Sequence, residues 1–145
     1  MRRNTIGFIG AGNMAGALIK GLLESGTYQA QTLFVSDKRK EAVENLVSAY
    51  GINRCESNRS VLEKCDTVVL AVKPQNMKEV MGEIKGHLYS SHFVISIAAG
   101  IPLKMISSFT GESVPIARVM PNTPALVQCG ISAISFGADV SEELV

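Results

Sequence analysis

Short apolar runs alternate along this chain with longer segments in which apolar residues recur every three or four positions. The runs are rich in β-branched residues and cover residues 5–9, 33–35, 67–72, 93–97 and 115–120. The longer segments carry helical stripes, formed by Met14, Leu18 and Leu22 and by Ala42, Leu46 and either Ala49 or Tyr50. Because strands buried on both faces have continuous apolar runs, the pattern predicts an α/β domain, a parallel sheet covered by helices.

Capping residues and prolines place further helices. A helix is expected to begin after Ser57 or Asn58, whose side chains suit an N-cap. Pro74 and Pro102 each stand just inside a predicted helix start, where a proline loses nothing by lacking an N–H. These predicted helix starts extend the alternation of strands and helices through the middle of the chain.

The bulk composition narrows the function. With 145 residues, 46% of them apolar, the chain is long enough for one sizeable core and short for two ordinary domains. Its 14 basic and 13 acidic residues are spread along the sequence, so no basic footprint for nucleic acid is visible. No apolar stretch reaches the roughly 18 residues of a membrane span. We therefore expect a small-molecule substrate, with neither nucleic acid nor membrane as a partner.

The cysteines and histidines predict neither disulfides nor a metal site. Cys55, Cys65 and Cys129 make an odd number and form no C-x-x-C pair, which suits the reducing cytoplasm. His87 and His92 show no ligand spacing with the cysteines or with carboxylates. A cytoplasmic protein without a metal is expected.

The strongest local motif is Gly10-Ala11-Gly12-Asn13-Met14-Ala15, a G-x-G-x-x-A that follows a predicted strand and opens a predicted helix. In this pattern Gly10 permits the tight turn, Gly12 lets the backbone approach a pyrophosphate, and Ala15 keeps helix and strand close. The helix N-terminus adds free N–H groups and a positive dipole end. The motif predicts a Rossmann-type fold, a doubly wound and mostly parallel sheet that holds a dinucleotide.

The adenosine end of the dinucleotide should lie about 20 residues further on, at Ser36-Asp37-Lys38-Arg39-Lys40. Asp37 could accept the ribose 2′-hydroxyl of NAD. Ser36 with Lys38 and Arg39 could instead hold the 2′-phosphate of NADP through charge-assisted hydrogen bonds. Three successive cations beside a serine favour NADPH as the cofactor, with NADH left open as the alternative.

Three later segments stand at the C-terminal ends of predicted strands, at the sheet edge where open parallel sheets bind ligands. Ala71-Val72-Lys73-Pro74 should face the cofactor, although Lys73 could equally be a surface lysine. Small side chains in Ser96-Ile97-Ala98-Ala99-Gly100 would let a flat ring lie against the sheet. In Arg118-Val119-Met120-Pro121-Asn122-Thr123-Pro124 the prolines fix the backbone, and Asn122 could donate to a carboxamide or substrate. No convincing general acid is found, so catalytic residues stay unassigned.

Together these motifs resemble one family, pyrroline-5-carboxylate reductase, over essentially the whole chain. The matching blocks stand in the family's order, and they are Ile6-Gly7-Phe8-Ile9-Gly10-Ala11-Gly12-Asn13-Met14, Ala71-Val72-Lys73-Pro74, Ser96-Ile97-Ala98-Ala99-Gly100 and Arg118-Val119-Met120-Pro121-Asn122-Thr123-Pro124. The last two blocks are the more specific, because the first two also occur in related reductases. The resemblance implies NADPH-dependent reduction of the C=N bond of 1-pyrroline-5-carboxylate, which gives proline.

The resemblance also implies roles for the residues. Residues 9–14 would bind the pyrophosphate, while the basic run and Asn58 would contact the adenosine end. Residues 71–74 and 98–100 would line the nicotinamide side, and Asn122 would sit near the reacting ring. The expected cofactor-binding residues are Ile9, Gly10, Ala11, Gly12, Asn13, Met14, Ser36, Lys38, Arg39, Asn58, Ala71, Val72, Lys73, Pro74, Ala98, Ala99, Gly100 and Asn122.

A division into domains follows from the same resemblance. Residues 1–137 would form the NADP-binding domain, and residues 130–136 predict its last strand. Ser141 or Asp139 resembles the N-cap of a new helix, so residues 138–145 would begin a linker helix to a C-terminal helical domain. In the family, that domain dimerises, closes the substrate site and supplies a threonine for the ring nitrogen. We therefore expect a shortened piece of a homo-oligomeric enzyme, which binds cofactor but turns over little substrate.

Two alternatives stay open at this point. The chain could come from a related hydroxyacid dehydrogenase or imine reductase, or it could be a non-catalytic module in which dinucleotide binding regulates a partner. The block at residues 118–124 favours the pyrroline-5-carboxylate reductase. Further helical segments after Val145 in the native reading frame would argue against the non-catalytic module.

Overall fold

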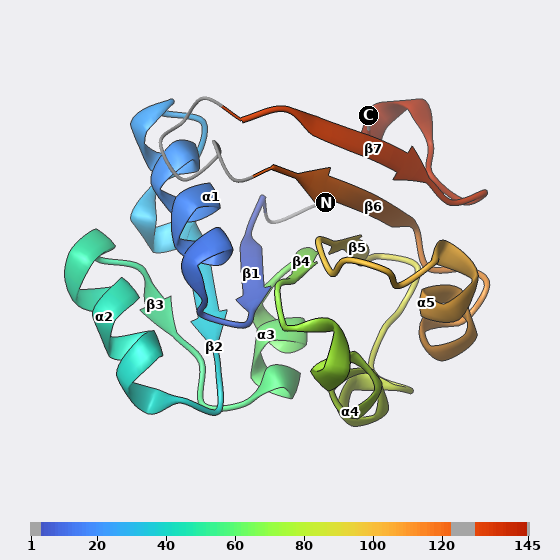
Figure 1. Cartoon of the computed structure of the whole chain (residues 1–145), viewed down its shortest axis with the longest axis horizontal. Coiled ribbons are helices and arrows are strands. Elements are labelled where there is room, and N and C mark those ends of the chain that lie inside the picture. The colour runs from blue at the N-terminus through green and yellow to red at the C-terminus, as the bar shows by residue number, and fades with distance from the viewer. Residues whose placement is uncertain (1–3, 123–129, 145) are drawn as a thin grey trace.

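The computed structural model describes residues 4–122 and 130–144, which form one sheet with helices on both faces (Figure 1). The strands are β1 (Ile6–Ile9), β2 (Leu33–Ser36), β3 (Asn53–Arg54), β4 (Thr67–Leu70), β5 (Phe93–Ser96), β6 (Ile116–Pro121) and β7 (Ser132–Phe136). The α-helices are α1 (Asn13–Glu24), α2 (Lys40–Tyr50), α3 (Asn58–Lys64), α4 (Met77–Ile84) and α5 (Leu103–Thr110). Short 3₁₀ turns are η1 (Ala30–Thr32), η2 (Pro74–Asn76) and η4 (Glu142–Leu144).

The strand order creates a place for a ligand. Within the described residues the sheet runs β3-β2-β1-β4-β5-β6-β7. Neighbouring strands are parallel from β3 across to β6, and β7 pairs antiparallel with β6. The chain winds outward from β1 to β3 and then crosses back to β4, so the direction of winding reverses between β1 and β4. Doubly wound sheets bind ligands at the carboxyl ends of the strands beside such a reversal. The predicted Rossmann-type, mostly parallel fold is confirmed.

Each face of the sheet has its own core, because alternate residues of a strand point to opposite faces. Phe8 packs with Ile19 of α1 and Val43 of α2 on one face. The next residue, Ile9, belongs to the core on the other face, which α3, α4 and α5 cover. Burial on both faces explains why the central strands have no polar alternation.

Gly7 lets α3 lie directly on β1. A Cβ at this position would be 2.2 Å from Val61 Cγ1 and 2.8 Å from Cys65 Sγ, closer than atoms can approach. The helix begins as predicted, with Ser57 as the N-cap whose hydroxyl accepts a hydrogen bond from Ser60 N. This contact seats the middle and end of α3 on β1, while the hydrogen bond from Ser36 Oγ to Asn58 Oδ1 at 2.8 Å holds the start of the helix beside the end of β2.

Several predicted boundaries need correction. The apolar runs at residues 67–72 and 93–97 overestimate β4 and β5, which end at Leu70 and Ser96 where the chain turns toward the next helix. Strand β3 was not predicted, because Asn53 and Arg54 are polar and too few to make a pattern. It forms through the sheet, where Cys55 N donates to Val35 O at 2.8 Å.

Helix starts also differ in detail from the prediction. Pro74 begins η2, as expected, but Pro102 is the N-cap before α5 and not its first helical residue. The helix predicted after residue 138 is the 3₁₀ turn η4 in the described part of the chain. Residues Thr123, Pro124, Cys129 and Val145, which entered the sequence argument, lie outside the described residues.

The outer strand β7 is exposed along its whole length, and its Ile134 and Phe136 side chains are 55% and 42% exposed. Over residues 4–122 and 130–144, no helix combines the length and the apolar character needed to cross a bilayer. The same residues contain no group of three or more histidine, cysteine or acidic side chains placed to hold a metal ion.

Candidate dinucleotide-binding site

A pocket of about 1010 Å³ opens at the carboxyl ends of β1, β2 and β4, beside the reversal of winding. The loops after these strands line it, together with parts of α1, α2 and α4. The volume lies at the upper end of the range for small-molecule sites, as a dinucleotide requires. The lining includes Ile9, Gly10, Ala11, Gly12, Asn13, Lys38, Arg39, Asn58, Ala71, Val72 and Lys73 from the predicted set.

The two glycines of the β1–α1 loop are needed for different reasons. Gly10 has φ +110°, and a Cβ there would lie 2.5 Å from the backbone oxygen of Ala71, so the fold itself requires glycine. Gly12 has φ −82° and an open space where its Cβ would be. Because Gly12 precedes α1 and offers no side-chain cap, the first N–H groups of the helix are left for a ligand. The loop therefore fits a pyrophosphate.

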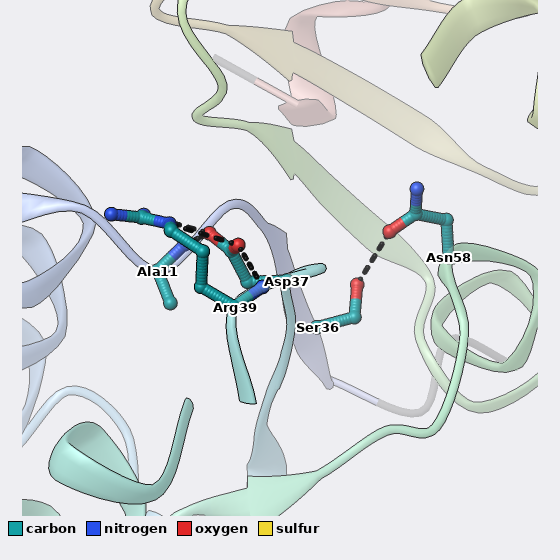
Figure 2. Close-up of polar contacts among 5 residues, drawn as sticks. All are labelled: Ala11, Ser36, Asp37, Arg39 and Asn58. Atoms are coloured by element: carbon teal, nitrogen blue, oxygen red, sulfur yellow. Dashed lines mark hydrogen bonds and ion pairs between the residues drawn. The ribbon is translucent and has the colours of Figure 1, made fainter. Parts of the chain in front are cut away.

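Asp37 ties the glycine loop to the loop after β2, where the sequence predicts the adenosine end of a dinucleotide (Figure 2). Its Oδ2 accepts hydrogen bonds from Ala11 N at 2.8 Å and from Arg39 Nη2 at 3.0 Å. Its Oδ1 accepts from Arg39 N at 2.8 Å and from Arg39 Nε at 3.2 Å. Burial raises the pKa of this carboxyl, but the hydrogen bonds from Arg39 and Ala11 outweigh it and hold the pKa below 3.8.

These contacts change the interpretation of Asp37. A carboxylate has about four lone-pair sites, and bonds from described residues already use that number at Asp37. A ribose 2′-hydroxyl would have to displace Arg39 or Ala11 N to reach it. The geometry therefore weakens the NAD interpretation and gives Asp37 a structural role in the loop.

Ser36 and Asp37 turn toward different partners: Asp37 toward Ala11 and Ser36 toward Asn58 (Figure 2). Ser36 pairs with Ile9 in the sheet, and its buried hydroxyl donates to Asn58 Oδ1 at 2.8 Å on the α3 face. Asn58 Nδ2 donates in turn to Glu83 Oε2 at 2.6 Å. Ser36 is not among the described residues that line the pocket, so the structure places it behind Asn58 and not with Lys38 and Arg39.

Glu79 lines the pocket and was not predicted to belong to the site. Its Oε1 pairs with Lys38 Nζ, which joins α4 to the β2–α2 loop. This hydrogen bond raises the pKa of Lys38 above its usual 10.5. The helical pattern of α4 indicates only that Glu79 and Glu83 face outward, because the buried side of the helix is formed by Met77, Val80, Met81 and Ile84.

Seven of the predicted residues are not among the described residues that line the pocket. Among the described residues, the lining omits Met14, Ser36, Pro74, Ala98, Ala99, Gly100 and Asn122. Ala98 is buried in the core beneath α5, and Gly100 turns the chain with φ +73°. Asn122 Oδ1 accepts a hydrogen bond from Ile131 N at 2.9 Å, so this side chain joins the ends of β6 and β7.

Comparison with known proteins shows the family to which this chain belongs. A family model described as NADP oxidoreductase, coenzyme F420-dependent, matches residues 5–100. The pyrroline-5-carboxylate reductase of Pseudomonas aeruginosa is 42% identical over 136 residues, which are 94% of this chain and 50% of that protein. The chain thus spans about half the length of the curated relatives it matches.

Solved structures agree with the sequence matches. A pyrroline-5-carboxylate reductase from Coxiella burnetii superposes with a TM-score of 0.91 at 33% identity, covering 96% of this chain and 52% of that one. Pyrroline carboxylate reductase from Plasmodium falciparum with NADP bound superposes with a TM-score of 0.82 at 31% identity, covering 99% and 52%. The chain therefore belongs to the family described as NADP oxidoreductase, coenzyme F420-dependent, and its predicted resemblance to pyrroline-5-carboxylate reductase is confirmed.

Proposed function

We propose that this chain is the NADPH-binding part of a pyrroline-5-carboxylate reductase, which reduces the C=N bond of 1-pyrroline-5-carboxylate to give proline. The observation that carries the proposal is the open position at Gly12, in front of the uncapped start of α1 in a pocket of dinucleotide size. The relatives with the same name support the substrate, and the relative with NADP bound supports the cofactor. The bound cofactor would supply the hydride.

The residues of the chain would bind and orient the cofactor. Residues 9–14 would hold the pyrophosphate through backbone N–H groups, and Lys38 and Arg39 would hold the 2′-phosphate. Asn58, held by Ser36, would lie beside the adenosine ribose. Residues 71–74 would border the nicotinamide.

The segments outside the pocket lining also have a place in the proposal. The loop at residues 98–100 follows β5, the strand beside β4, and would extend the nicotinamide side beyond the pocket. Asn122 would stand near the reacting ring at the end of β6. The order of the strands at the carboxyl edge supports these positions.

The substrate site is proposed to need a further domain. We assign residues 1–137 to the cofactor-binding domain and residues 138–145 to the start of a linker, which the doubled length of the relatives supports. The second domain would close over the imine, supply the proton and form a homo-oligomer. A cytoplasmic location is proposed as well, and the free, buried thiols of Cys55 and Cys65 support it.

Cofactor titration tests the proposal directly. The chain is titrated with NADPH and with NADH while nicotinamide fluorescence is followed, and NADPH is expected to bind more tightly. Gly12→Ala should weaken binding of both by about tenfold or more, because the methyl group takes the space of the pyrophosphate.

Gly82→Ala is the matched control. Gly82 also has open space at its Cβ position, but it lies on the exposed side of α4 and is not among the described residues lining the pocket. Its replacement should leave both affinities unchanged. Failure of the unmodified chain to bind either cofactor would overturn the proposed function.

A further inference from the structure

Both cations at the adenosine end of the pocket already have an acidic partner. Arg39 is paired with Asp37, and Lys38 is paired with Glu79. Glu83 adds a second negative charge close enough to act on Lys38. These five side chains carry two positive and three negative charges, so Lys38 and Arg39 bring no excess positive charge for a phosphate. The third cation of the basic run, Lys40, is not among the described residues that line the pocket.

The two ion pairs differ in how easily they can change partner. The Asp37 side chain is 11% exposed. It accepts hydrogen bonds from both the backbone N–H and the guanidinium of Arg39. The Lys38 and Glu79 side chains are 65% and 56% exposed, and exposed pairs of this kind contribute little to stability. Lys38 also carries a compact charge on a flexible stem. Lys38 is therefore the cation that can exchange its partner for an entering phosphate, and Glu79 competes with that phosphate for Lys38.

We propose that Glu79 is a specificity-determining residue that lowers the preference of this site for NADPH over NADH by competing with the 2′-phosphate for Lys38. The inference rests on the proposed cofactor-binding function. Glu79 lines the same pocket, so its ion pair with Lys38 occupies the cation that an incoming 2′-phosphate would need. NADH has a neutral hydroxyl at the corresponding place and does not meet this competition. Glu79 thus acts through Lys38, as a positioning residue for the cation.

The ratio of the two dissociation constants measures the effect. In Glu79→Gln, NADPH should bind about three- to fivefold more tightly, which is the size of an exposed charge interaction. NADH binding should change by less than about twofold. In a chain that also carries Lys38→Met, the gain from Glu79→Gln should largely vanish, because the cation through which Glu79 acts is gone. Raising the salt concentration should reduce the gain as well.

A matched control separates this effect from a general change of charge. Glu44 is an exposed acid paired with Arg54, and it is not among the described residues that line the pocket. Glu44→Gln removes the same charge elsewhere, and the ratio should stay as in the unmodified chain. Glu79→Asp keeps the charge and should keep most of the original ratio.

The outcomes are distinct. An unchanged or lower preference for NADPH in Glu79→Gln, or the same gain with and without Lys38, overturns the inference while leaving cofactor binding in place. Absence of NADPH and NADH binding in the unmodified chain overturns the proposed function and the inference with it. A gain confined to NADPH that depends on Lys38 establishes Glu79 as a determinant of cofactor choice.

Discussion

The two ends of the pocket are built in opposite ways. At the glycine loop, backbone meets backbone: Gly10 N donates to Ser36 O at 2.8 Å, and a Cβ on Gly10 would strike Ala71 O. At the proposed adenosine end, long charged side chains line the pocket, and the Lys38 and Glu79 side chains are each more than half exposed. Close backbone packing holds the glycine-loop end in one conformation, whereas the ion pair at the other end can change partner.

This difference between the two ends predicts which substitutions change the stability of the fold and which change the choice of cofactor. A change at Gly10 alters a position that the sheet itself depends on, so it should affect stability and binding together. A change at the exposed ion pair is expected to alter which cofactor binds more tightly and to leave the core unchanged. Variants ordered from the loop to the ion pair should therefore show falling effects on stability.

Gly10→Ala is expected to have the largest effect. The alanine would have to adopt φ near +110° and move the backbone of Ala71, which costs about 3 kcal/mol of unfolding free energy. Urea unfolding followed by circular dichroism measures the loss. Gly12→Ala is the control, because its Cβ meets open space, and it should unfold like the unmodified chain. Equal stability of the two variants would contradict the conclusion that the fold requires glycine at position 10 and tolerates a side chain at position 12.

Asp37→Asn is expected to have an intermediate effect, about 1–2 kcal/mol at neutral pH, because it removes the charge from the hydrogen bonds that join Ala11 and Arg39. The pKa of Asp37 is lowered on folding, so its ionised form adds stability above pH 3.8. That stability is lost as pH falls through the folded-state pKa.

Unfolding at a series of pH values checks both the size and the sign. The stability difference between the unmodified chain and Asp37→Asn should be full at neutral pH and should shrink below about pH 4. A difference that grew on acidification, or that did not depend on pH, would show that the carboxylate does not hold the loop through its charge.

Glu79→Gln is expected to have the smallest effect on stability. Because the ion pair with Lys38 is exposed, the melting temperature should stay close to that of the unmodified chain, even though the cofactor preference changes. Differential scanning calorimetry without cofactor makes the comparison. A clear drop in melting temperature would place the adenosine end among the parts that the fold requires.

The same contrast explains what the sequence could predict. Gly10 and Gly12 were identified because a tight turn and a helix start are local demands that fix the residue type at a given spacing. Continuous apolar runs likewise predicted the buried strands. The direction of Ser36 was missed, because it depends on which face of β2 the residue occupies at the strand's last position.

Long-range contacts account for the rest. Lys38 and Glu79 are 41 positions apart, and Asn58 and Glu83 are 25 apart, so no local pattern connects them. The basic run therefore looked like a free anion site, whereas each of its two pocket-lining cations has an acidic partner. Strand β3 was missed for a related reason, since its two polar residues become a strand only beside β2.

The hydrogen bond from Ala11 N to Asp37 Oδ2 makes the backbone amides of the loop a natural reporter of occupancy. Amide protons held by an acceptor exchange slowly with deuterated solvent, and those without one exchange quickly. The Ala11 amide should thus be slow in the free protein, while the amides at the uncapped start of α1 should slow down only when a phosphate arrives. Exchange kinetics at neighbouring positions would then distinguish the framework of the loop from the part that holds the ligand.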